Sequence, residues 1–119
     1  MPSLRVMIVE DEPLIAMAME VIVEDAGGQT TGTHSTVKEA LGAVAAEPRI
    51  DVALLDCNLG KEACWPVAEA LAKRNVPFAF TSGQGMKDMD PRFADRPVFA
   101  KPVDEEKLKR FLRQYSRME

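Results

Sequence analysis

Short, mainly apolar runs divide the chain into segments of strand length. Three of them, residues 4–9, 52–55 and 98–100, each end directly before a charged residue. Aliphatic runs this short are typical of strands that are buried on both faces of a parallel sheet. A threonine-rich run at 29–33 and an aromatic run at 76–80 have the composition of two more strands. The pattern therefore predicts five strands.

Between these strands, apolar residues recur at helical spacing. The first helix is expected to begin at Pro13, where a missing N–H costs little, and to stop at the glycine pair 27–28. Thr36 and Glu39 have the spacing of a capping box, which opens a second helix. A third helix is expected over 66–74, and a last one near the C-terminal end. The residues predicted to face the core are Leu14, Ile15, Ala18, Val21 and Ile22 in the first helix, Val37, Leu41 and Val44 in the second, Val67 and Leu71 in the third, and Leu108, Phe111, Leu112 and Tyr115 in the last.

The alternation of strands and helices breaks once, between residues 83 and 97. Two glycines, Pro91 and several charges there favour a fourth helix that is short or irregular. Alternating units with right-handed crossovers build a parallel sheet with helices on both faces. A chain of 119 residues has room for one such core and hardly for two. We therefore predict one doubly wound α/β domain over residues 1–119, with five strands and five helices.

Composition and charge narrow the functions open to this chain. The formal net charge of −4 argues against a nucleic-acid surface. No apolar run reaches the roughly 20 residues of a membrane helix, and no signal-peptide pattern precedes Arg5, so we expect a cytoplasmic protein without a membrane partner. Cys57 and Cys64 have no Cys or His framework around them, which disfavours a zinc site or a disulfide scaffold. We expect both to be packing residues, with redox sensing as the alternative.

Residues with reactive side chains follow four of the five predicted strands. Because the strands are parallel, their carboxyl ends meet at one edge of the sheet, where open α/β proteins bind their ligands. We therefore expect these side chains to share one crevice. They are Glu10 and Asp11 after the first strand, Asp56 after the third, Ser82 or Thr81 after the fourth, and Lys101 after the fifth.

Taken together, these residues predict a phosphoryl-transfer site. Three carboxylates in one crevice repel by roughly 3 kcal/mol per pair at ~5 Å and an effective dielectric of about 20. A divalent cation removes this cost, and Mg²⁺ is usually held by few carboxylates and several waters. Lys101 and Ser82 can bind phosphoryl oxygens, which leaves Asp56 as the nucleophile. Singly, each residue also has a simpler explanation: a helix-dipole effect for Glu10 and Asp11, a turn for Ser82, a solvated lysine for Lys101.

This arrangement resembles the receiver domain of bacterial two-component response regulators. The motifs that carry the resemblance are Val-Glu-Asp-Glu at 9–12, Leu-Leu-Asp-Cys-Asn-Leu at 54–59, Thr-Ser-Gly at 81–83 and Ala-Lys-Pro at 100–102. The resemblance spans nearly the whole chain, from Val6 to about Tyr115. It implies a flavodoxin-like fold with strand order 2-1-3-4-5.

The resemblance also implies roles for individual residues. Asp56 would be the phospho-acceptor, with Glu10 and Asp11 as the acidic pair. Mg²⁺ would be coordinated by Asp11, Asp56 and the backbone carbonyl of Asn58, and Lys101 would contact the phosphoryl group. The implied phosphodonor is a sensor histidine kinase or a histidine phosphotransfer protein. A downstream protein would read a surface around residues 83–100 and 104–115, and no catalysis is implied beyond the domain's own phosphorylation and dephosphorylation.

A narrower resemblance is to the FAT GUY receivers, which are mostly stand-alone regulators. Asp56-x-Asn-Leu-Gly60, Pro66-Val-Ala68 and Pro77-Phe-Ala-Phe-Thr-Ser-Gly83 carry it. Counting onward from Pro77 places Ser82, not Thr81, at the hydroxyl position of the family, although threonine is usual there. The two side chains point to opposite faces of a strand and cannot share the role. Val98 stands where other receivers have a switch aromatic, so we hypothesise that phosphorylation orders residues 83–97 instead.

Two other functions are compatible with parts of this pattern. Small phosphatases of the haloacid dehalogenase type also use an aspartyl nucleophile, Mg²⁺, a hydroxyl and a lysine. Their D-x-D pattern needs a second acid as general acid–base, and Asn58 occupies that position here. The second alternative is a docking module that keeps the fold without being phosphorylated, against which the intact set of acids, hydroxyl and lysine argues.

Overall fold

The computed structural model describes residues 3–83 and 89–115. Its main sheet has five parallel strands in the order β2-β1-β3-β6-β7. Counting only the strands of this sheet, the order is 2-1-3-4-5, so the predicted topology is confirmed. The strands are β1 (Leu4–Val9), β2 (Gly28–His34), β3 (Val52–Asp56), β6 (Phe78–Ser82) and β7 (Val98–Ala100).

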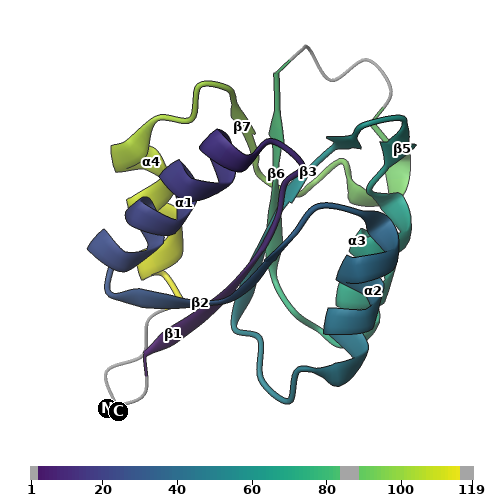
Figure 1. Ribbon diagram of the computed structural model, residues 1–119, viewed down its shortest axis with the longest axis horizontal. Coiled ribbons are helices and arrows are strands. Elements are labelled where there is room, and N and C mark those ends of the chain that lie inside the picture. The colour runs from purple at the N-terminus through teal and green to yellow at the C-terminus, as the bar shows by residue number, and fades with distance from the viewer. Residues whose placement is uncertain (1–2, 84–88, 116–119) are drawn as a thin grey trace.

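Helices cover both faces of the sheet, as Figure 1 shows: α1 and α4 lie on one face, α2 and α3 on the other. The expected fourth helix is reduced, in the part of the chain that is described, to the short 3-10 helix η1 (Pro91–Phe93). Residues 84–88 lie outside the described ranges. Within those ranges no helix has both the length and the apolar character needed to cross a membrane. The α-helices are α1 (Pro13–Asp25), α2 (Val37–Ala46), α3 (Trp65–Lys73) and α4 (Glu105–Arg113).

The central strands have apolar side chains on both faces, so the sheet separates two hydrophobic cores. Alternation along β1 sends Val6 and Ile8 to the core under α1 and α4, and Met7 and Val9 to the core under α2 and α3. All residues of β3 are buried, as predicted for a strand covered on both faces. The α3 side is rich in aromatic contacts, among Trp65, Phe78, Phe80 and Phe93.

The core-facing side predicted for α1 was partly wrong. Residues 13–23 are apolar at every position except Glu20, so helical spacing alone fits more than one face. The helix turns a different stripe to the sheet, and a second apolar stripe faces solvent. The buried residues are Ala16, Met19, Ile22 and Val23, whereas Leu14, Met17, Ala18 and Val21 are exposed.

Two further differences lie near the carboxyl edge of the sheet. Strand β6 was expected at 76–80 but spans Phe78–Ser82, so both hydroxyl residues belong to the strand. The segment after β3, where none of the five predicted strands lies, forms a small antiparallel ribbon of β4 (Asn58–Leu59) and β5 (Glu62–Ala63). Gly60, with φ of 63°, provides the left-handed position that its connection needs.

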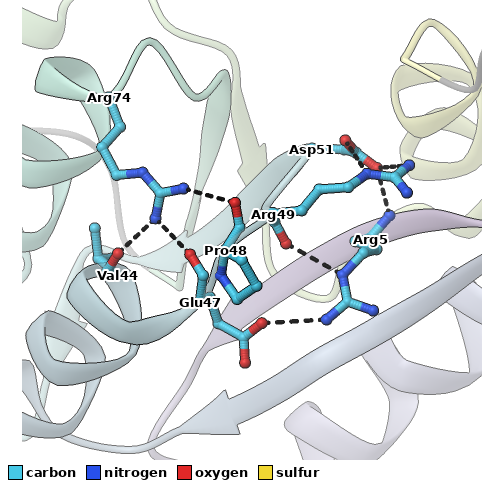
Figure 2. Close-up of polar contacts among 7 residues, drawn as sticks. All are labelled: Arg5, Val44, Glu47, Pro48, Arg49, Asp51 and Arg74. Atoms are coloured by element: carbon cyan, nitrogen blue, oxygen red, sulfur yellow. Dashed lines mark hydrogen bonds and ion pairs between the residues drawn. The ribbon is translucent and has the colours of Figure 1, made fainter.

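Polar contacts tie the opposite, amino edge of the sheet together (Figure 2). Asp51 accepts a hydrogen bond from the backbone N–H of Arg5 and forms an ion pair with Arg49. Arg5 also bonds to the carboxylate of Glu47 and the carbonyl of Arg49. The C-terminal end of α2 leaves carbonyls that no helical N–H can reach, and a guanidinium can satisfy several of them. Arg74 does so, donating to the carbonyl oxygens of Val44, Glu47 and Pro48.

Candidate functional site

Three carboxylates converge at the carboxyl edge of the sheet. Glu10 and Asp11 follow β1, and Asp56 ends β3, the neighbouring strand. Each offers an oxygen, and these oxygens all lie within 4.8 Å of one another. Glu10 and Asp56 are buried, while Asp11 is partly exposed. The three acids therefore lie close together at one edge of the sheet, while their roles stay predictions.

Lys101 completes this group from the last strand of the sheet. Its Nζ lies 2.9 Å from Oδ2 of Asp56 and 3.0 Å from Oε1 of Glu10. Its backbone N–H donates to the carbonyl of Ser82, which fixes the end of β7 against β6. Burial by itself would lower the pKa of the Lys101 ammonium, but hydrogen bonds to Asp56 and Glu10 raise it above its usual value. The amine is therefore charged.

Backbone N–H groups hold two of the carboxylates in place. The amide of Asn58 donates to Oδ1 of Asp56 at 3.1 Å, and the amide of Glu12 donates to Oε2 of Glu10 at 3.1 Å. Sequence analysis did not identify these donors. Each donor lies two residues after its acid. This spacing is typical of turns in which a side chain accepts from the backbone, and it could have predicted both hydrogen bonds. The other oxygen of each carboxylate, Oε1 of Glu10 and Oδ2 of Asp56, faces the ammonium of Lys101.

The site has the charge and donor set that a divalent cation requires. Three carboxylates face one ammonium, so negative charge is in excess when all are ionised. Oε1 of Glu10 is buried and contacts the ammonium of Lys101 at 3.0 Å. A hard cation with oxygen ligands fits this arrangement. Asp11 and Asp56 would ligate it, and the exposed Asn58, whose carbonyl the resemblance implies as a further ligand, lies two residues after the end of β3.

The metal-free protein is expected to lose stability as pH rises through the titration of Glu10. Burial raises the pKa of this carboxyl from 4.5 to about 7, against the lowering effect of Lys101. Between these values the folded chain keeps a proton that the unfolded chain has released, so the free energy of unfolding falls with rising pH. Urea unfolding in a chelator, from about pH 5 to about pH 8, measures this slope. Glu10→Gln should flatten it, and an unchanged slope in that variant would contradict the assignment.

Both candidate hydroxyls are buried at this edge. Thr81 pairs with Asp56 in the parallel ladder between β3 and β6, and its Oγ1 has no hydrogen-bond partner among the described residues. Ser82 is the last residue of β6 and pairs with Ala100, next to Lys101. A Cβ at Gly83 would only touch Cδ of Lys101, at 3.9 Å. Both residues thus lie at the carboxyl end of β6, beside Asp56 and Lys101 in the strand register, and the choice of Ser82 stays a prediction.

Comparisons with known proteins agree with this fold and site. The model of the response regulator receiver domain family matches residues 6–113. The solved structure of SdrG from Sphingomonas melonis Fr1 is 46% identical, with 89% of this chain and 90% of that chain covered and a TM-score of 0.79. A BeF3-activated conformation of SdrG, from Pseudomonas melonis Fr1, is also 46% identical, with coverage of 94% and 96% and a TM-score of 0.76.

A third solved structure, the receiver domain of the PhyR response regulator from Erythrobacter litoralis, is 28% identical. It has coverage of 96% and 90% and a TM-score of 0.79. A comparison with the curated proteins finds no match. A doubly wound sheet with an acidic crevice and a lysine at its carboxyl edge is the architecture of a phospho-accepting regulatory domain. The chain belongs to the response regulator receiver domain family.

Proposed function

We propose that this receiver domain accepts a phosphoryl group on Asp56 in a Mg²⁺-dependent reaction. The observation that carries this proposal is the position of the Asp56 carboxylate. It lies within 4.8 Å of Glu10 and Asp11 and 2.9 Å from the ammonium of Lys101. The proposed donor is a histidine kinase or a histidine phosphotransfer protein in a bacterial cytoplasm.

The reaction follows from the charges at the site. A carboxylate oxygen of Asp56 attacks the phosphorus of a phosphohistidine; a P–O bond forms, the P–N bond breaks and the imidazole leaves with the electron pair. Bound Mg²⁺ supplies positive charge for the phosphoryl oxygens. Lys101 neutralises a further oxygen, and the hydroxyl of Ser82 donates a hydrogen bond. The amide of Asn58 keeps Asp56 oriented through its bond to Oδ1.

Intact-protein mass spectrometry tests this proposal directly. The protein is incubated with acetyl phosphate and Mg²⁺, and the gain of one phosphoryl group is expected. A docking module that is not phosphorylated would show no gain under any donor, including a cognate kinase. A phosphatase of the haloacid dehalogenase type would instead turn over small phosphate esters, which we expect to be negligible because Asn58 offers no proton at the second acid position.

Removing the Ser82 hydroxyl is expected to slow phosphorylation more than removing that of Thr81. A hydrogen bond to a charged group is worth about 1.5–3 kcal/mol, which corresponds to about 10- to 100-fold in rate. Ser82→Ala should lose this factor. Thr81→Val, which keeps the shape of the side chain, should change the rate little. The reverse order, measured as the rate of phosphorylation by acetyl phosphate, would assign the role to Thr81.

We further propose that the output surface lies around residues 83–100 and 104–115. Residues 84–88 of this surface lie outside the described ranges. In the described part, Phe93 of η1 is buried against Phe78 and Phe80 of the sheet, so this segment has a docked position that phosphorylation can favour. Amide exchange across 83–97 is expected to slow on adding Mg²⁺ and beryllofluoride. Unchanged exchange would contradict this readout.

A further inference from the structure

The two cysteines of the chain face each other beside the phospho-acceptor. Cys57 directly follows Asp56, and Cys64 directly precedes α3. The ribbon between them pairs Asn58 with Ala63 and Leu59 with Glu62, so one further step along the same register opposes Cys57 to Cys64. The amide of Cys64 donates to the carbonyl of Cys57 at 3.1 Å. The two cysteines, although apart in sequence, are therefore opposed to each other across the ribbon.

The register of the ribbon suits a disulfide. One backbone hydrogen bond joins the two cysteines, from Cys64 to Cys57, while the amide of Cys57 donates to the carbonyl of Thr81. Directly opposed residues of an antiparallel pair have Cα atoms about 4.5–5.5 Å apart, inside the range of about 4.4–6.8 Å seen for disulfides. Side chains of directly opposed residues point to the same side of a ribbon. The two thiols do meet, because a side-chain hydrogen bond joins them, and both belong to the core cluster under α2 and α3. In this structure both are thiols.

Small molecules can reach this pair by a local opening. Both cysteines are buried, and the ribbon that joins them has two residues in each strand and no strand pairing to the main sheet. Asn58 and residues 60–63 are exposed. A two-stranded ribbon of this size contributes little stability of its own, so it opens at a small cost compared with the sheet.

We propose that Cys57 and Cys64 are a modification site that forms a reversible intrachain disulfide with hydrogen peroxide as the oxidant. One thiol loses its proton and attacks a peroxide oxygen; an S–O bond forms, the O–O bond breaks and one water leaves. The sulfur of the other thiol then attacks the sulfenic sulfur, and a second water leaves as the S–S bond forms. Two thiols are oxidised to one disulfide while one hydrogen peroxide is reduced to two waters. A dithiol reverses the bond by exchange.

The disulfide controls cation binding at Asp56, a consequence that rests on the proposed function. An S–S bond of about 2.05 Å is far shorter than a hydrogen-bonded contact between thiols, so the sulfur atoms of Cys57 and Cys64 and the segments that carry them have to approach each other when it forms. Cys57 lies between Asp56 and Asn58, whose amide orients the Asp56 carboxylate at 3.1 Å. Oxidation therefore displaces the oxygens that would hold Mg²⁺, and its affinity falls.

The test treats the full chain with hydrogen peroxide, then denatures it and alkylates with N-ethylmaleimide. We expect monomers that have lost two hydrogens, take up no label and yield a Cys57–Cys64 linked peptide, and dithiothreitol should restore two labels. Cys57→Ala and Cys64→Ala, each with one thiol, should give sulfenic acid or linked dimers instead. Two labels after treatment of the parent, or separate sulfinic acids, would overturn the proposal.

A second measurement separates this site from the phosphorylation site. Asp56→Asn should form the disulfide as completely as the parent. Disulfide formation therefore tests the cysteine pair independently of whether Asp56 is phosphorylated. Mg²⁺ titrations should give an affinity roughly fivefold or more weaker for the oxidised parent than for the reduced one. Cys64→Ala treated in the same way should show no such loss. Equal affinities in the presence of a complete disulfide would overturn the coupling to the cation.

Discussion

Replacing Asp56 with asparagine is expected to abolish phosphorylation by acetyl phosphate and by any kinase. The amide keeps the size of the side chain and can still accept the hydrogen bond from the backbone of Asn58, but it is not a nucleophile for phosphorus. Intact-protein mass spectrometry should show no phosphoryl gain in this variant under conditions that modify the parent. Retention of a stable phosphoryl group in Asp56→Asn would assign the acceptor to another residue.

The same substitution is expected to stabilise the metal-free protein. It removes one of three carboxylates that lie within 4.8 Å, while Glu10 still pairs with Lys101, so the lost repulsion is worth about 1–3 kcal/mol of unfolding free energy. Mg²⁺ should raise the melting temperature of the parent more than that of the variant, because one ligand is gone. Asp51→Asn is the matched control at the other edge. Asp51 bonds Arg5 and Arg49 without acidic neighbours in the contacts described, so its neutralisation should destabilise.

Lys101→Met is expected to destabilise the metal-free protein strongly. The Lys101 ammonium is the cation within 4.0 Å of the buried Glu10 and Asp56, and its side chain is only 16% exposed. Removing one partner of a buried ion pair costs about 3–5 kcal/mol, because the remaining charges are left uncompensated. Chemical denaturation in the presence of a chelator measures this loss. Methionine keeps most of the alkyl stem, so the effect reports the charge.

Lys109→Met provides the control for this variant. The side chain of Lys109 is similarly covered, at 14% exposed, and also has three acidic neighbours, which are Asp25, Glu105 and Glu106. Those carboxylates are at the surface, where such pairs contribute little to stability. Mg²⁺ should recover more stability in Lys101→Met than in Lys109→Met, because its positive charge can replace that of the Lys101 ammonium beside Glu10 and Asp56. Equal losses in the two variants would contradict the buried cluster.

The sheet and its site could be predicted because chain order and strand direction are enough for both. The apolar runs at β1, β3 and β7 are short and end at charged residues, so their boundaries were found closely. Once the strands are parallel, residues that follow them must meet at one edge, and no side-chain detail is needed to bring Glu10 and Asp56 together with Lys101. The bond from the Asn58 amide depends on local turn geometry, which the acid positions alone do not specify.

Two features could not be predicted, each for a physical reason. The face of α1 depends on how the helix rotates against the sheet, and a helix with Leu14, Met17 and Val21 on one stripe and Met19 and Ile22 on another offers hydrophobic burial in either orientation. The ribbon after β3 depends on four residues and one glycine in a left-handed conformation, too few for any periodic pattern to emerge.

The aromatic cluster on the α3 side gives the protein a built-in optical probe. Trp65 is the only tryptophan of the chain and lies one residue after Cys64. Its indole contacts Phe80 of the strand that leads to the hydroxyls and Phe93 of η1, with ring centroids 5.5 Å and 6.3 Å away. Its emission should therefore respond to events at the acidic crevice and in the output segment alike, so that kinetics can be followed in the natural chain without an attached dye.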